Sequence, residues 1–105
     1  MERIVIAAYK PLPGKLAELE SLIKSHWQIL KDQDLVSDRK SIIMQAKDGT
    51  ILEVFGWKSK QAIEAAHKNA AVLEMWQEYA SVCEYISVDK VPEATELFSE
   101  FTPIN

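Results

Sequence analysis

The fold is decided by the stretch RIVIAAY, residues 3–9, and by what the rest of the chain can pack against it. Alternate side chains of a β-strand point to opposite faces of its sheet. The two faces of this strand carry Ile4, Ile6 and Ala8 on one side and Val5, Ala7 and Tyr9 on the other. Neither set is suited to water, so we expect the strand to be covered on both sides.

Downstream of this strand, Pro11-Leu12-Pro13-Gly14 breaks the backbone, and a helical pattern follows. Spacings of three and four residues relate Leu16, Leu19, Leu22, Ile23, Trp27 and Leu30. This periodicity predicts a helix over about residues 16–30 with one apolar face. A turn signal, Asp48-Gly49, then lies between apolar runs at 41–46 and 51–57, which predicts an antiparallel hairpin.

The second half of the chain predicts two capped helices and a last strand. Ser59 can cap a helix through His67, and Asn69 can cap a helix that carries apolar residues as far as Cys83. Residues 85–88 read as the final strand. Pro92 suits the start of a short helix to about residue 98, and the apolar tail 101–105 is expected to pack across a subunit boundary.

This order of elements predicts one α+β domain over residues 1–105 with the ferredoxin-like split βαβ arrangement. A four-stranded antiparallel sheet would carry its helices on one face only. The other face would be bare in a monomer. Burying about 800 Å² per partner would outweigh the cost of association, so we expect a homodimer whose sheets face each other as a dimeric α/β barrel.

The composition of the chain limits which classes of partner we expect it to bind. The chain has 105 residues and a formal charge of -4, and its basic residues form no stripe, so nucleic acid is not expected as a partner. It contains no apolar run long enough to span a membrane, and we expect a cytoplasmic protein. Its single cysteine, Cys83, is interpreted as core filler. Neither a glycine-rich phosphate loop nor a metal-ligand spacing is present, so no metal or cofactor is expected.

Few residues can carry chemistry. His67 is the first candidate base, because Ile63 four residues earlier places it on the apolar side of its helix; the alternative is a helix-end histidine bonded to a backbone carbonyl. Glu53 stands among apolar neighbours and is the second candidate for proton transfer, although an inter-subunit salt bridge is the preferred interpretation. His26 lies at the edge of an apolar stripe, where partial exposure is expected, and it is a further candidate for binding a ligand.

Aromatic side chains could bind a flat ligand by stacking. The candidates are Trp57, Phe55, Trp76 and Tyr79, and their alternative role is ordinary core packing.

The run from Val54 to Ala62, followed by Ala66-His67 and a helix opening Asn69-Ala70-Ala71-Val72-Leu73, resembles the antibiotic biosynthesis monooxygenase-like domains. The resemblance implies a dimeric α/β barrel with a substrate cavity between the sheet and its own helices. Members of that family include cofactor-free monooxygenases of polycyclic phenols or quinols, haem-degrading enzymes and proteins without an assigned activity.

Two departures limit what the resemblance implies. Trp57 matches the tryptophan of haem-degrading members, but Trp76 stands where they have the iron-ligating histidine, and Ala7 stands near their asparagine. An indole cannot ligate iron, so haem degradation is disfavoured. In the polyketide oxygenases an asparagine precedes the tryptophan by four residues, and that position is Glu53 here. The hypotheses are therefore a cofactor-free oxidoreductase acting on an aromatic or quinol-type molecule, or a non-catalytic binding dimer on the same fold.

Overall fold

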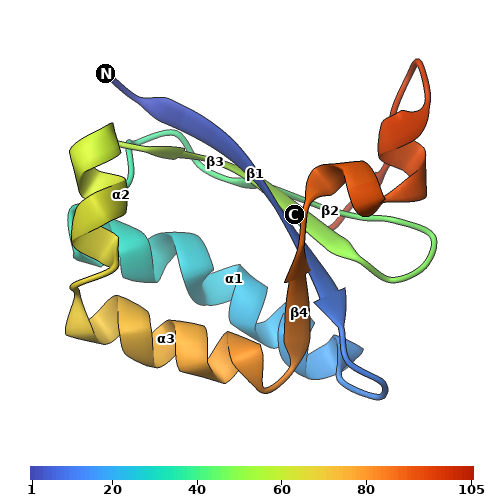
Figure 1. Ribbon diagram of the computed structural model, residues 1–105, viewed down its shortest axis with the longest axis horizontal. Helices are drawn as coiled ribbons and strands as arrows, with labels where there is room; N and C mark the ends of the chain where they lie inside the picture. The colour runs from blue at the N-terminus through green and yellow to red at the C-terminus, as the bar shows by residue number, and fades with distance from the viewer.

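The computed structural model describes all residues, 1–105, and consists of one antiparallel sheet with helices on one of its faces (Figure 1). The main elements are β1 (Arg3–Pro11), α1 (Leu16–Asp32), β2 (Ile42–Gln45), β3 (Ile51–Trp57), α2 (Lys60–Ala66), α3 (Ala70–Ala80) and β4 (Cys83–Ile86). Two 3-10 turns, η1 (Val88–Lys90) and η2 (Pro92–Thr95), and a short strand β5 (Thr102–Pro103) complete the chain. The strand order is β4-β1-β3-β2-β5. The predicted α+β class is confirmed, and the order is compatible with a ferredoxin-like fold.

Local signals that the sequence predicted are present in the structure. Gly49 adopts a φ of 96° in the β2–β3 turn, where the Asp48 carboxylate accepts a hydrogen bond from the Thr50 amide at 2.9 Å. Ser59 Oγ accepts from the Ala62 amide at 3.1 Å, so both this N-cap and the hairpin are confirmed. Asn69 caps α3 in the same way, through the Val72 amide at 3.1 Å.

α1 and α3 lie side by side across one face of the sheet, with α2 at the end where β3 finishes (Figure 1). The buried residues of α1 are Leu19, Ile23, His26 and Leu30. They pack on the face of β1 and β3 that carries Tyr9, Ile51 and Phe55. Because His26 belongs to this buried row, it lies at the centre of the helix's apolar face, and the expectation of partial exposure for His26 is wrong.

The opposite face of the sheet is partly covered by the chain's own C-terminal segment. Val91 packs with Ala8, Ala46 and Leu52 in a second, smaller buried cluster. The tail then returns to the sheet edge, where β5 pairs with Met44 and Gln45 of β2. The sheet therefore has five strands instead of the predicted four, and the tail packs on its own chain, because its extended backbone satisfies the free edge of β2.

Two predicted boundaries also differ. The helix expected over residues 92–98 is only the 3-10 turn η2, and Leu97 and Phe98 beyond it are exposed. The last strand occupies Cys83–Ile86 instead of residues 85–88, because α3 ends at Ala80. What remains uncovered on the second face is an apolar patch of Ile4, Ile6 and Ile42, each about half exposed. No helix combines the length and apolar character that crossing a bilayer requires.

Cys83 is buried at the start of β4, and its thiol donates to the Tyr79 carbonyl oxygen at 3.2 Å. Burial raises the pKa of the Cys83 thiol to about 11. Because the thiolate is the reactive form, we expect iodoacetamide at pH 8 to label the native protein far more slowly than the urea-unfolded protein. Equal labelling rates in the two states, measured by mass spectrometry, would contradict this placement.

Candidate functional site

The site with the clearest chemistry is a cavity of about 380 Å³ between the sheet and its helices. It is lined by Val5, Ala7 and Tyr9 of β1, His26 of α1, Phe55 and Trp57 of β3, Trp76 of α3 and Tyr85 of β4. The strand residues all lie on the helix-facing side, since β1 and β3 pair with Val5 opposite Phe55 and Arg3 opposite Trp57. The lining is almost wholly apolar and aromatic, which suits a flat ring compound.

Behind this wall lies a buried polar cluster. Glu53 of β3 is 0 % exposed and His26 is 4 % exposed. His26 Nδ1 lies 2.7 Å from Glu53 Oε1. The Tyr9 hydroxyl donates to the same carboxylate oxygen at 3.1 Å. Glu53 is thus paired inside its own chain, instead of across a subunit boundary, because β3 places it beside Tyr9 and beneath α1.

The pairing leaves one ring nitrogen of His26 for the cavity. Nδ1 is fully enclosed next to Glu53, so the small exposed area of this cavity-lining side chain belongs to its other ring atoms. A carboxylate this close to Nδ1 favours the tautomer with the proton on that nitrogen, in which Nε2 is the proton acceptor. This arrangement can act as a general base toward a ligand hydroxyl or an acidic C–H group in the cavity.

Tyrosine rings surround the cluster. Tyr9 and Tyr79 have ring centroids 5.4 Å apart, and Tyr79 and His26 are 5.5 Å apart. Burial, and then the nearby Glu53 carboxylate, raise the pKa of Tyr9 and of Tyr79 above the ordinary range, so both phenols stay neutral donors near pH 7. Burial likewise raises the pKa of Tyr85 to about 12. The Tyr79 hydroxyl, Glu53 Oε2 and His26 Nδ1 are buried without a partner in hydrogen-bond geometry, although Nδ1 lies 2.7 Å from Glu53 Oε1.

His67 lies outside the cavity. It follows α2, is exposed, and its Nδ1 lies 2.9 Å from the Ile63 carbonyl oxygen. This is the helix-end arrangement given above as the alternative to a catalytic base. Its ring packs edge-on against Trp76, with centroids 5.2 Å apart, so it touches the outside of a residue that lines the cavity.

The structure brings together most of the predicted site residues. His26, Phe55, Trp57 and Trp76 line the cavity, and Glu53 lies directly behind it. Tyr79 packs on Tyr9 and His26 without lining the cavity. Sequence reasoning did not select Tyr9 and Tyr85, although the alternation in β1 had placed Tyr9 on one face with Val5 and Ala7.

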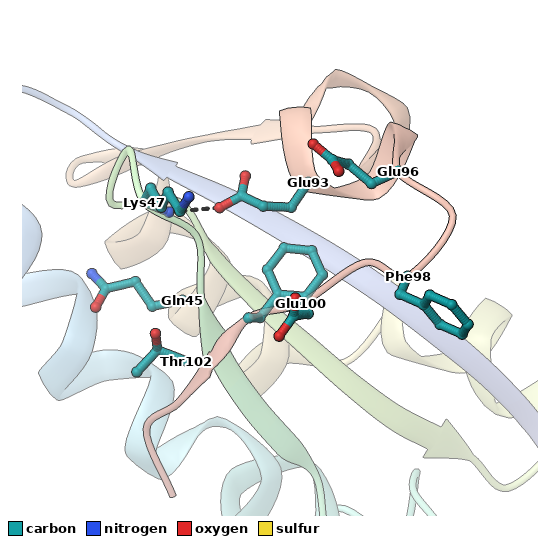
Figure 2. A pocket seen from close by; sticks show the side chains of 8 residues that line it. Gln45, Lys47, Glu93, Glu96, Phe98, Glu100 and Thr102 are labelled. Carbon is teal, nitrogen blue, oxygen red and sulfur yellow. Dashed lines mark hydrogen bonds between the residues drawn. The ribbon is translucent and has the colours of Figure 1, made fainter.

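A second hollow, of about 400 Å³, lies near the C-terminal turns and contains none of the predicted residues (Figure 2). Its lining includes Glu93, Glu96 and Glu100 with one basic residue, Lys47. The Glu93 carboxylate accepts from the Lys47 backbone amide at 2.8 Å, which fastens η2 to the β2–β3 turn (Figure 2). This contact has a structural role.

No group of three or more His, Cys, Asp or Glu side chains has the geometry of a metal site. Within the cavity wall, His26 is a side chain that can accept a proton, and it lies beside Glu53 and among aromatic rings. Comparison of this chain with protein-family models, with curated proteins and with solved structures found no match.

Proposed function

We propose that this protein is a homodimer, similar to the antibiotic biosynthesis monooxygenase-like proteins, that binds an aromatic or quinol-type molecule in the cavity and oxidises it without a cofactor. The observation that carries the proposal is the buried His26–Glu53 pair in the wall of an otherwise aromatic cavity. A buried base in the wall of an apolar ring site has a defined use, because it can take a proton from a ring compound bound against it.

The proposed reaction requires the protein to supply one base that accepts a proton and later returns it. A hydroxyanthrone gives one proton to His26 Nε2, and the resulting carbanion attacks dioxygen at its former methylene carbon. His26 returns the proton to the peroxide, which loses water as the carbonyl forms. The net change is CH₂ plus O₂ to C=O plus H₂O, with all four electrons supplied by the substrate carbon. The Glu53 carboxylate, 2.7 Å from His26 Nδ1, stabilises the imidazolium that exists between these two proton transfers.

Oxygen uptake tests the activity. We expect the native protein to accelerate oxygen consumption with a panel of hydroxyanthrones and quinols, and His26→Gln to lower kcat by about 10²- to 10⁴-fold, the usual contribution of a general base. His67→Ala is the matched control, because His67 is exposed outside the cavity and should leave kcat unchanged. Uptake that depends on His67 and not on His26 would reverse the assignment of the base.

Ligand binding separates the enzyme from a non-catalytic binding domain on the same fold. Anthraquinone, which cannot be oxidised further in this way, should quench the fluorescence of Trp57 and Trp76 in the cavity wall. Trp27→Phe should keep this quenching, since the Trp27 indole donates to the Arg39 carbonyl oxygen at 2.9 Å and lies outside the cavity lining. Saturable quenching without oxygen uptake on any substrate would favour the binding function.

The apolar patch of Ile4, Ile6 and Ile42 on the second face of the sheet supports the proposed homodimer. A second copy of the chain offers the same patch, so a two-fold axis through it would bury both at once. Leu97 and Phe98, exposed in the segment that follows η2, would extend the buried area toward the roughly 800 Å² per partner of a stable interface.

Ile6→Glu tests this interface, because a charge at the centre of the patch would meet its own copy across the axis. We expect the native protein to sediment as a dimer at micromolar concentration and the variant as a folded monomer. Leu73→Glu is the matched control, since Leu73 is an exposed apolar residue on α3, and it should remain dimeric. A native protein that sediments as a monomer would overturn the proposed dimer.

A further inference from the structure

The edge of β1 next to the cavity has no partner strand over its first half. β1 runs from Arg3 to Pro11, but β4 pairs only with Ala8 to Pro11. After Ile86 the chain leaves the sheet and enters η1. The β1 backbone from Arg3 to Ala7 is therefore a free edge that begins where the cavity lining begins.

The backbone groups of Ile4 point toward this free edge. Ile4 lies opposite Gly56 in the β1–β3 ladder. The Gly56 carbonyl oxygen accepts from the Ser37 amide at 2.9 Å, on the side of β3 away from β1. Because backbone groups of an antiparallel pair alternate in direction, Ile4 makes no ladder bonds to Gly56, and its N–H and C=O face outward. Leu12 is an even number of residues from Ile4, so its backbone groups point to the same side of the strand. Its amide donates to the Val82 carbonyl oxygen next to β4, which agrees with this direction for Ile4.

A hollow of about 570 Å³ surrounds this edge and contains two basic side chains. It is lined by Met1, Arg3, Ile4, Val5, Lys60, Gln61 and Ile63. Val5 also lines the aromatic cavity, so the two spaces share a wall. Arg3 and Lys60 are exposed and form no ion pair. The nearby Glu2 carboxylate is held by Arg39 and does not neutralise them.

We propose that this hollow is an anion subsite, and that the molecule held in the cavity is a ring compound with an anionic substituent on a short arm. This inference depends on the proposed function, because the ring must occupy the cavity for its arm to pass Val5. The Arg3 guanidinium and the Lys60 ammonium supply charged donors, and the unpaired Ile4 amide supplies a third donor fixed by the sheet. Charged donors of this kind bind carboxylates more strongly than alcohols.

A matched pair of ligands tests the subsite. We expect 3-(1-naphthyl)propanoic acid to quench the cavity tryptophans at about tenfold lower concentration than 3-(1-naphthyl)propan-1-ol at low salt, as a charge-assisted hydrogen bond allows. The difference should shrink in 0.5 M NaCl, because salt screens exposed charges. The double variant Arg3→Gln/Lys60→Gln should bind the alcohol as before and lose the preference for the acid.

The control variant is Lys24→Gln/Lys90→Gln, which removes two positive charges from α1 and η1, away from the hollow. It should keep the preference for the acid. Equal affinity of the native protein for acid and alcohol, or equal loss in both double variants, would overturn the anion subsite and leave the cavity function standing. If neither naphthyl compound binds the native protein, the proposed cavity function fails, and the subsite with it.

Discussion

Replacing Glu53 by alanine should lower the free energy of unfolding by about 2 to 6 kcal/mol, because each of two buried polar groups that loses its partner costs about 1 to 3 kcal/mol. Glu53 is fully buried, and its Oε1 atom is the shared partner of His26 Nδ1 and the Tyr9 hydroxyl. Without the carboxylate, two buried polar groups on α1 and β1 lose their partner at once, and water cannot replace it.

Urea unfolding followed by circular dichroism measures this loss, and Glu53→Gln is the matched variant. The amide keeps an oxygen that can accept from Tyr9 or from His26 Nδ1, so we expect it to cost clearly less than the alanine, about 1 to 2 kcal/mol. In oxygen-uptake assays, however, Glu53→Gln should lower kcat, since a neutral amide stabilises a protonated His26 less well than a carboxylate does. An alanine variant as stable as the native protein would contradict the buried cluster.

Removing the whole ring of Tyr79 should change the free energy of unfolding far more than removing its hydroxyl alone. Tyr79 is fully buried in the core, and its ring packs on Tyr9 and His26. Tyr79→Ala should cost about 3 to 5 kcal/mol in unfolding free energy, because it removes a large buried ring and leaves a cavity. Tyr79→Phe should leave stability unchanged or raise it by about 1 kcal/mol, because the hydroxyl is buried without a hydrogen-bond partner.

The same urea titration, run on both Tyr79 variants, tests this contrast. A loss of more than about 2 kcal/mol in Tyr79→Phe would mean that the hydroxyl has a partner in solution, such as a bound water molecule. A loss of less than about 1 kcal/mol in Tyr79→Ala would mean that the ring is not part of the core.

Elements with strong local signals were predictable from the chain alone. The Asp48-Gly49 turn brought β2 and β3 together, and the caps Ser59 and Asn69 started α2 and α3 where expected. Each of these signals acts through hydrogen bonds between residues two or three positions apart, so the sequence contains the whole interaction. The second half of the sheet was less predictable, because β5 pairs Thr102 and Pro103 with a strand almost sixty residues earlier.

The candidate site, too, was predictable for some residues and not for others. Four of the five residues proposed to bind a ligand line the cavity, since aromatic residues at strand and helix spacing face the interior whether or not they bind. The two histidines differ from this pattern. The sequence placed His67 on the apolar side of its helix and His26 at the edge of an apolar stripe, whereas the structure buries His26 and exposes His67. A shift of a single residue along a helix changes the side that a side chain faces, and periodicity does not resolve such a shift near the helix ends.

Periodicity and contacts between near neighbours were enough to predict the class of fold, the order of elements as far as β4, the hairpin and the helix starts. The packing of the whole chain is what brings Glu53, His26 and Tyr9 into one buried cluster and places Arg3 and Lys60 at a free strand edge. These residues come from different elements, and their meeting depends on strand register and on the rotation of α1, which are fixed only when the whole core packs.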